Sequence, residues 1–167
     1  RFDLSGEQYF QVAELKTAAL FAYAAWAGSY LPREDESFSN NFARYAESLG
    51  IAFQLVDDVL DFQSGSTGKE ALDDLEKGNI NYPLIQLLER DPRLGRRVKR
   101  EFQDGGVSSE TKQKVLEGVR TSGVLDQARG KAREYTSPAR ASLETVDDNN
   151  RTRLLREIPE FVTERLS

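Results

Sequence analysis

The pattern of apolar and polar residues is most informative between residues 50 and 62, which read GIAFQLVDDVLDF. On a helix of 3.6 residues per turn, the polar side chains share an arc of roughly 100°, and all remaining positions after Gly50 are apolar. These polar side chains are Gln54, Asp57, Asp58 and Asp61. A helix that is apolar nearly all round is buried, so a solvated acidic stripe is the weaker interpretation. The pattern therefore predicts a buried helix with three carboxylates and one amide on a single side.

Apolar residues also recur upstream of this stretch at spacings of three and four, the period of one helix face. The recurring residues are Phe38, Phe42, Tyr45, Leu49, Phe53, Val56 and Leu60. This apolar stripe keeps its phase across Gly50 and lies opposite the acidic face. We therefore predict one long helix that starts near Ser37 and continues through Gly50. Its apolar face should pack against the rest of the protein, and its acidic face should line a cavity.

An earlier helix is predicted to start near Gly6, because Ser5 and Gln8 have the spacing of a capping box. It should stop before Pro32. The apolar run is short for a membrane span and ends in a proline, so we predict a buried helix rather than a transmembrane segment. Lys16, the only charged residue between positions 15 and 32, would either extend to the edge of this helix or point into a polar cavity and bind an anion.

Further helices follow along the chain. They are predicted at residues 70–77, 83–90, 94–102 and 110–120, then from about residue 123, and finally at 151–166. Gly78 should end the first of these and Pro83 should open the next. Ser109 is a candidate cap, and Pro138 is expected to interrupt or kink its helix. Because no strand alternation with hairpin turns is present, we predict an all-α protein whose residues 1–167 form a single domain.

The composition limits the chemistry that this chain can perform. Its 167 residues carry a net charge of −5 and include neither cysteine nor histidine. The charge argues against general nucleic-acid binding, and the missing residue types exclude disulfides, thiolate metal sites and imidazole catalysis. Catalysis would have to come from carboxylates, lysines, arginines or a bound metal. Clustered carboxylates are hard oxygen ligands that suit Mg²⁺ or Ca²⁺.

The segment after the acidic helix, QSGSTGKE at residues 63–70, is predicted to be a loop. It has a superficial likeness to a phosphate-binding P-loop, but Gln63 and Glu70 occupy the positions of the first glycine and of the Ser or Thr. We therefore reject that interpretation. Lys69 is either a solvated lysine or a cation that the loop returns toward the acidic helix.

Several blocks of this sequence together resemble the trans-isoprenyl diphosphate synthases, also called polyprenyl synthetases. The matching blocks are Lys16-Thr17, Phe53-Gln54, Asp57-Asp58 with Asp61, Gly68-Lys69, Asp74 and Pro83-Leu84-Ile85. The acidic block resembles the second aspartate-rich motif of the family, and the spacing between blocks also agrees. The resemblance covers essentially the whole chain but only about the C-terminal half of a family member, without the first aspartate-rich motif. Since the chain begins at Arg1, we expect it to be part of a longer or processed protein.

The resemblance implies an isoprenoid-synthase-type helical bundle and a prenyltransferase. Such an enzyme condenses an allylic diphosphate with isopentenyl diphosphate to make a longer trans-polyprenyl diphosphate, with Mg²⁺ as cofactor. Diphosphate leaves the allylic substrate, the double bond of isopentenyl diphosphate attacks the resulting cation, and a proton is lost. By this resemblance Asp57 would ligate Mg²⁺ directly, and Asp58 and Asp61 would act directly or through water.

The resemblance also implies roles for the residues around the aspartates. Lys16 and Lys69 would bind the oxygens of the allylic diphosphate. Thr17 and Gln54 would lie near the reacting carbons, and Phe53 would help to wall the hydrocarbon cavity. One departure is Asn79, which stands where some members carry a further phosphate-binding lysine.

Assembly and location follow from the resemblance as further expectations. Family members form homodimers, and the aromatic-rich helix at residues 17–31 is a candidate for part of the interface, or else is simply core. We expect a cytoplasmic protein, with removal of a transit peptide as the alternative. Two other functions compete: a non-catalytic subunit of a heteromeric synthase, and a terpene cyclase of the same fold. The three aspartates disfavour the cyclase, whose second metal motif usually mixes Asn, Ser or Thr with Glu.

Overall fold

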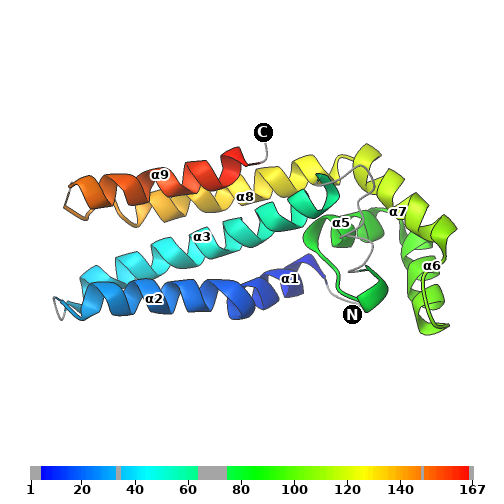
Figure 1. The fold of residues 1–167 in the computed structure, drawn as a ribbon, viewed down its shortest axis with the longest axis horizontal. Helices are drawn as coiled ribbons and strands as arrows, with labels where there is room; N and C mark the ends of the chain where they lie inside the picture. Colours follow the sequence, from blue (N-terminus) through cyan, green and yellow to red (C-terminus); the bar gives the residue numbers. More distant parts are fainter. Residues whose placement is uncertain (1–4, 33–34, 64–74, 148, 166–167) are drawn as a thin grey trace. The chain divides into compact units, whose positions relative to one another are not determined.

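The computed structural model describes residues 5–32, 35–63, 75–147 and 149–165, and these residues form helices joined by turns (Figure 1). No strand occurs in these ranges, which confirms the all-α class. The elements are α1 (Gly6–Ala13), a π-helical turn η1 (Glu14–Ala18), α2 (Ala19–Tyr30), α3 (Glu36–Gln63), α5 (Tyr82–Arg90), α6 (Pro92–Gln103), α7 (Ser109–Thr121), α8 (Val124–Ala141) and α9 (Asn150–Glu164). Gly68, Lys69 and Asp74 lie outside the described residues, as does most of the predicted loop.

Most predicted helix ends are confirmed. The capping box at α1 is formed, with the Ser5 N–H donating to Gln8 Oε1 at 3.0 Å and the Gln8 N–H donating to Ser5 Oγ at 3.2 Å. Gly78 ends a helical segment with a φ of 73°, a conformation that glycine adopts without strain. Pro83 lies in the first turn of α5, where a proline costs no hydrogen bond.

One predicted cap was wrong. The N-cap of α7 is Ser108 and not Ser109, because the Ser108 hydroxyl accepts the Thr111 N–H. Helix α8 continues through Pro138 to Ala141, so the proline does not interrupt it, and the alternative of a kink stays a prediction. A proline inside a helix removes one hydrogen bond but does not force a stop where the surrounding packing holds the helix.

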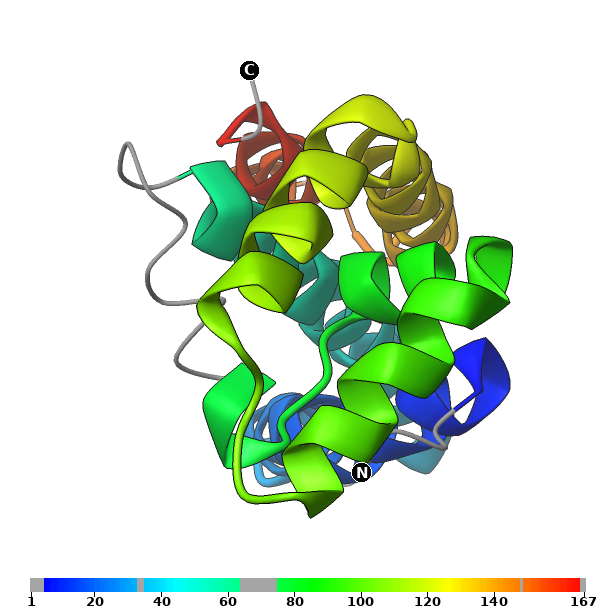
Figure 2. The same cartoon turned by 90° about the vertical axis from the view of Figure 1, so that its right-hand side faces the viewer.

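The described residues form two compact units. Unit 1 contains residues 5–9, 57–63 and 75–128, and unit 2 contains residues 10–32, 35–56, 129–147 and 149–165. In unit 1, helices α5, α6 and α7 pack on one another, and their connections can be followed in Figure 2. Its apolar core is built from Phe62, Leu75, Leu84, Leu87, Leu94, Val98, Val107, Val115, Val119 and Val124.

In unit 2, helices α2 and α3 lie side by side in antiparallel directions (Figure 1). At the π-helical turn η1, directly before α2, a Cβ on Gly50 would lie 2.8 Å from the Ala18 Cα. Gly50 therefore lies inside one continuous helix, as predicted, and its missing side chain makes room for the neighbouring backbone. The buried core of this unit includes Tyr45, Ala46, Ala139, Leu143 and Val146.

Helix α2 lies on the surface of the described part of the chain, so its predicted place in a core or an interface stays a prediction. None of its residues is buried in the described part of the chain, and Leu20 and Tyr23 are 67% and 68% exposed. An apolar run indicates that a helix needs a partner, but it does not say which surface provides one. In the ranges that the structure describes, no helix combines the length and apolar character that crossing a membrane requires.

Candidate active site

The acidic face of α3 is not a solvated stripe. Asp58 is 5% exposed, and Asp57, Asp61 and Gln54 are half-buried. Three of their apolar neighbours on the helix, Leu55, Val56 and Val59, are fully buried. The sequence prediction of a buried helix that carries carboxylates is therefore confirmed, and carboxylates withdrawn from water need compensating positive charge or hydrogen bonds.

Asp58 finds such compensation at the start of α5. Its Oδ2 accepts the backbone N–H of Tyr82 at 2.9 Å, inside unit 1. This N–H is one of the first-turn groups that have no partner within their own helix, and it lies at the positive end of the helix dipole. A backbone amide therefore provides part of the compensation for Asp58.

Tyr9 and Tyr82 join this arrangement, and sequence reasoning missed both. Their ring centroids are 5.3 Å apart, and both side chains are buried. Burial, together with the nearby Asp58 carboxylate, raises the pKa of the Tyr9 phenol, so it stays protonated at neutral pH. Helical periodicity cannot show partners on separate helices; Pro83 predicted only that a helix starts near Tyr82.

The carboxylates do not form a complete metal cage by themselves. Among the described residues, no three Asp or Glu side chains converge on a single point where they could hold a metal ion. This still fits Mg²⁺, which keeps several waters and is usually bound through one or two carboxylates plus substrate phosphates. Asp57 and Asp61 are one turn apart on α3, so they form a suitable pair of hard oxygen donors.

In unit 2, Lys16 and Thr17 lie in the π-helical turn η1, which interrupts the first helical segment. Thr17 Oγ1 donates to Gln54 Oε1 at 3.2 Å, which links this turn to α3. The Lys16 side chain is exposed. Single π-helical turns occur frequently at functional sites, and no sequence signal used above predicted this one.

Phe53 lies between two partners in unit 2. Its ring centroid is 6.3 Å from that of Phe21, and the Arg165 guanidinium is 5.7 Å from the centre of the same ring. An arginine at that distance from an aromatic face is attracted to it. Sequence analysis did not foresee either contact, because Phe21 and Arg165 are remote from Phe53 along the chain.

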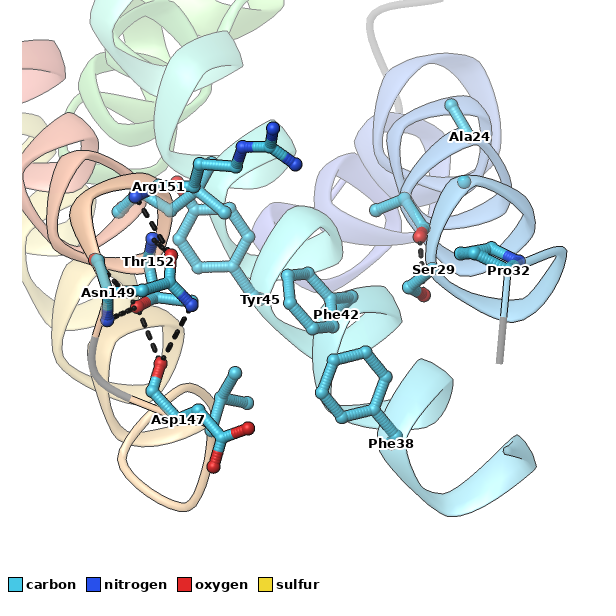
Figure 3. Close-up of a pocket in the computed structure, with 14 residues that line it drawn as sticks. Ala24, Ser29, Pro32, Phe38, Phe42, Tyr45, Asp147, Asn149, Arg151 and Thr152 are labelled. Carbon is cyan, nitrogen blue, oxygen red and sulfur yellow. Dashed lines mark hydrogen bonds between the residues drawn. The ribbon is translucent and has the colours of Figure 1, made fainter. Parts of the chain in front are cut away.

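Unit 2 also contains a half-open apolar cavity of about 450 Å³ near the turn between α2 and α3 (Figure 3). Phe38 and Phe42 of α3 point into it. Gly28 of α2 and Leu155 of α9 are also among the residues that line it. Its volume lies within the range of about 300–1,000 Å³ that is usual for small-molecule sites. The predicted wall residue Phe53 is not among the residues that line this cavity.

Polar groups around this cavity are mostly occupied by internal hydrogen bonds. Ser29 Oγ donates to the Ala25 and Trp26 carbonyls, and Tyr45 donates to the Leu155 carbonyl at 2.7 Å. These paired groups leave the α2 and α3 sides of the cavity chiefly apolar, whereas Asp147 and Arg151 add charged side chains to its lining.

Comparison with known proteins identifies the family. The model of the family described as polyprenyl synthetase matches residues 1–119. The chain belongs to the polyprenyl synthetase family. Among its relatives, a prenyl transferase of Cyanophora paradoxa is 33% identical over 168 residues, covering 99% of this chain and 51% of that protein. The chloroplastic solanesyl diphosphate synthase 1 of Arabidopsis thaliana is 32% identical over 146 residues, covering 86% and 35% respectively.

Solved structures of the family agree with the fold. A polyprenyl synthase from Caulobacter crescentus, complexed with calcium and isoprenyl diphosphate, superposes with a TM-score of 0.87 at 31% identity, covering 100% of this chain and 52% of that one. A polyprenyl synthase from Roseobacter denitrificans has the same TM-score at 28% identity, covering 99% and 55%. The all-α isoprenoid-synthase fold predicted from the sequence is thereby confirmed. The chain spans about half the length of the prenyl transferases of Cyanophora paradoxa and Synechocystis that it matches.

Proposed function

We propose that the protein to which this chain belongs is a prenyltransferase that extends an allylic diphosphate with isopentenyl diphosphate. The observation that carries this proposal is that the acidic face of α3 is partly shielded from water. Asp57 and Asp61 on this face are half-buried and lie one turn apart. Membership of the polyprenyl synthetase family supports it, as does the related structure that holds calcium and isoprenyl diphosphate.

The aspartates have separate roles in this proposal. Asp57 and Asp61 would hold Mg²⁺, with Asp58 as a further ligand, directly or through water, while it also accepts the Tyr82 N–H. When bound, the metal supplies positive charge that stabilises the departing diphosphate. Lys16, and Lys69 beyond the described residues, would bind the diphosphate oxygens as point charges.

Thr17 and Gln54 are proposed to lie beside the reacting carbons. The Thr17 hydroxyl donates to Gln54 Oε1, so the lone pairs of the threonine oxygen remain available to an electron-poor carbon. Fixed oxygen dipoles stabilise developing positive charge without reorganising during the reaction.

The apolar cavity is proposed to take the far end of the growing hydrocarbon chain. Ala24, the first α2 residue that lines it, is seven positions beyond Thr17, or about 10 Å along a helix. The paired rings of Phe21 and Phe53 lie between the Thr17–Gln54 hydrogen bond and the cavity. A hydrocarbon that leaves the Thr17–Gln54 level toward the α2–α3 turn would therefore meet apolar surface.

The test is incorporation of radiolabelled isopentenyl diphosphate by the full-length protein, with farnesyl diphosphate as the acceptor, in Mg²⁺ and in chelator. We expect Mg²⁺-dependent formation of a longer prenyl diphosphate. Activity that appears only after a second protein is added would favour the non-catalytic subunit. Release of a cyclic hydrocarbon without consumption of isopentenyl diphosphate would favour the terpene cyclase.

A homodimer is proposed on the same basis. The exposed apolar side chains of α2, such as Leu20 and Tyr23, would be covered by a second copy, which is the expectation from the family resemblance. Sedimentation equilibrium of the full-length protein should show a dimer, and a monomer at all concentrations would contradict the proposal. Cytoplasmic location remains a prediction, since one relative is named as chloroplastic.

A further inference from the structure

Helix α6 concentrates positive charge on one side. It carries five basic side chains and one acidic side chain, in a chain whose net charge is −5. Four of its arginines, Arg93, Arg96, Arg97 and Arg100, line an open surface hollow of about 450 Å³. All four belong to unit 1, so the feature is defined within that unit alone.

The opposite side of α6 is fixed in the core of unit 1. Leu94 and Val98 are buried members of the apolar cluster. Because these side chains anchor the helix, it cannot rotate to turn its basic side inward. Arg93, Arg96 and Arg100 are accordingly exposed to solvent.

Arg97 differs from the other three arginines because its charge is compensated. It pairs with Glu101 at 2.8 Å and with Glu110 at 3.1 Å. In the described part of the chain, no carboxylate forms an ion pair with Arg93, Arg96 or Arg100. Like charges at these spacings repel one another along a helix, so an external anion would relieve the repulsion.

We propose that this arginine face, consisting of Arg93, Arg96 and Arg100, docks the protein on the phosphate groups of an anionic lipid membrane. Guanidinium groups match phosphate oxygens in a two-pronged geometry. The three residues extend over about 10 Å of helix, so they form a row that meets several phosphates rather than a cage around one. The proposal concerns binding only and does not depend on the proposed activity.

The same observations disfavour other occupants. A net charge of −5 opposes a long nucleic acid, which would pass over the acidic remainder of the protein. The burial of Leu94 and Val98 leaves no apolar side of α6 to insert into lipid, so the contact is electrostatic and peripheral. Binding should therefore weaken as salt is raised.

The experiment is co-sedimentation of the full-length protein with vesicles of phosphatidylcholine alone or mixed with phosphatidylglycerol. The test variant is Arg93→Gln/Arg96→Gln/Arg100→Gln, which leaves the Arg97 ion pairs intact. The matched control is Arg120→Gln/Arg133→Gln/Arg151→Gln, which removes the same charge from exposed arginines of α7, α8 and α9. Circular dichroism melting confirms that both variants fold.

We expect the wild type to bind the mixed vesicles and not phosphatidylcholine alone. Each arginine near such a surface is worth roughly fivefold in affinity, so loss of three should weaken binding of the α6 variant about a hundredfold, while the control changes far less. Equal weakening in both variants would overturn the proposal, because it would reflect net charge alone.

A second arm separates the lipid from a soluble phosphate. Inorganic diphosphate is added at the same ionic strength as a chloride control, and its own binding is measured by calorimetry. If diphosphate releases the protein from the vesicles no more than chloride does, the result supports docking on the membrane surface. The membrane proposal would be overturned if the wild type bound diphosphate stoichiometrically and the α6 variant did not. It would also be overturned if the protein bound a single-stranded oligonucleotide but not the vesicles.

Discussion

Asp57 and Asp58 are adjacent in the sequence but have different surroundings. Asp58 is 5% exposed and accepts the first-turn N–H of α5, whereas Asp57 is half-buried. Helical periodicity placed both on one arc, which the structure confirms. It could not separate their roles, because the partner of Asp58 is 24 positions further along the chain. The difference leads to opposite expectations for the two substitutions.

In the full-length protein, Asp57→Asn should lower turnover sharply while leaving the metal-free fold intact. Loss of one carboxylate at the proposed metal site should cost about 2.7–4 kcal/mol of transition-state stabilisation. Removing a like charge one turn from Asp61 should leave the melting temperature in chelator unchanged or slightly higher. The measurements are isopentenyl diphosphate incorporation and thermal melting. A variant that melts much lower yet keeps its turnover would show that Asp57 holds the fold instead.

Asp58→Ala should act mainly on stability. The buried Tyr82 N–H would lose its acceptor, and leaving such a donor unsatisfied costs about 1–3 kcal/mol. Urea unfolding measures the loss. Asp58→Asn is the matched control, since it keeps an acceptor oxygen and should lose less. Equal stability of Asp58→Ala and wild type would mean that water replaces the carboxylate without cost.

The packing of η1 on α3 depends on the absence of a side chain at Gly50. A Cβ there would lie 2.8 Å from the Ala18 Cα and 3.2 Å from the Ala18 Cβ. Gly50→Ala should therefore destabilise the protein, because overpacking of about 1–3 kcal/mol outweighs a gain of about 1 kcal/mol in helix propensity. Gly130→Ala on α8 meets open space and should be neutral or stabilising. Chemical denaturation compares them, and a stabilised Gly50→Ala would contradict this close approach.

Helices α6 and α7 are joined by a charge network around Glu101. The Arg97 guanidinium, followed by the Ser108 and Thr111 donors, lowers the pKa of the Glu101 carboxyl from 4.5 to about 2. In this interval the unfolded chain binds more protons than the folded one, so stability is present above pH 4.5 and is lost as the pH falls toward 2.

Glu101→Gln should therefore be less stable than wild type at neutral pH and show a shallower loss of stability between pH 4.5 and about 2. Unfolding free energies across this pH series provide the measurement. Glu117→Gln, at an exposed position on α7, is the control and should follow the wild-type profile. Parallel profiles for Glu101→Gln and wild type would exclude the network as a source of acid sensitivity.

For the molecule as a whole, the proposed hydrocarbon route predicts a change in product. Gly28 lines the apolar cavity, and a Cβ at this position meets nothing within 4 Å. Gly28→Leu should fill part of the cavity and shift the products of the full-length protein to shorter chains. Thin-layer chromatography of the dephosphorylated products measures this shift. Gly130→Leu should leave the products unchanged, and an unaltered distribution with Gly28→Leu would place the tail elsewhere.

At this scale the sequence predicted the helix order and the all-α class, because caps and helical periods are local signals. It left open whether α2 belongs to the core or to an interface, since an apolar run such as that around Leu20 does not identify the surface that covers it. Nor did it predict the link between Asp58 and α5, which depends on how separate helices pack. Local patterns specified the elements, and long-range contacts determined the surroundings of the site residues.

The π-helical turn at Glu14–Ala18 has a consequence for how this segment can change over generations. A π turn is equivalent to one extra residue inserted into a regular helix. Deleting Leu15, which is 79% exposed, would remove little packing and would restore an ordinary helix. Because the wider π turn absorbs that residue, the deletion would leave the helix on either side of it, including the buried Ala13, on the faces that it already occupies. A one-codon deletion at Leu15 should therefore be inherited about as freely as substitutions there.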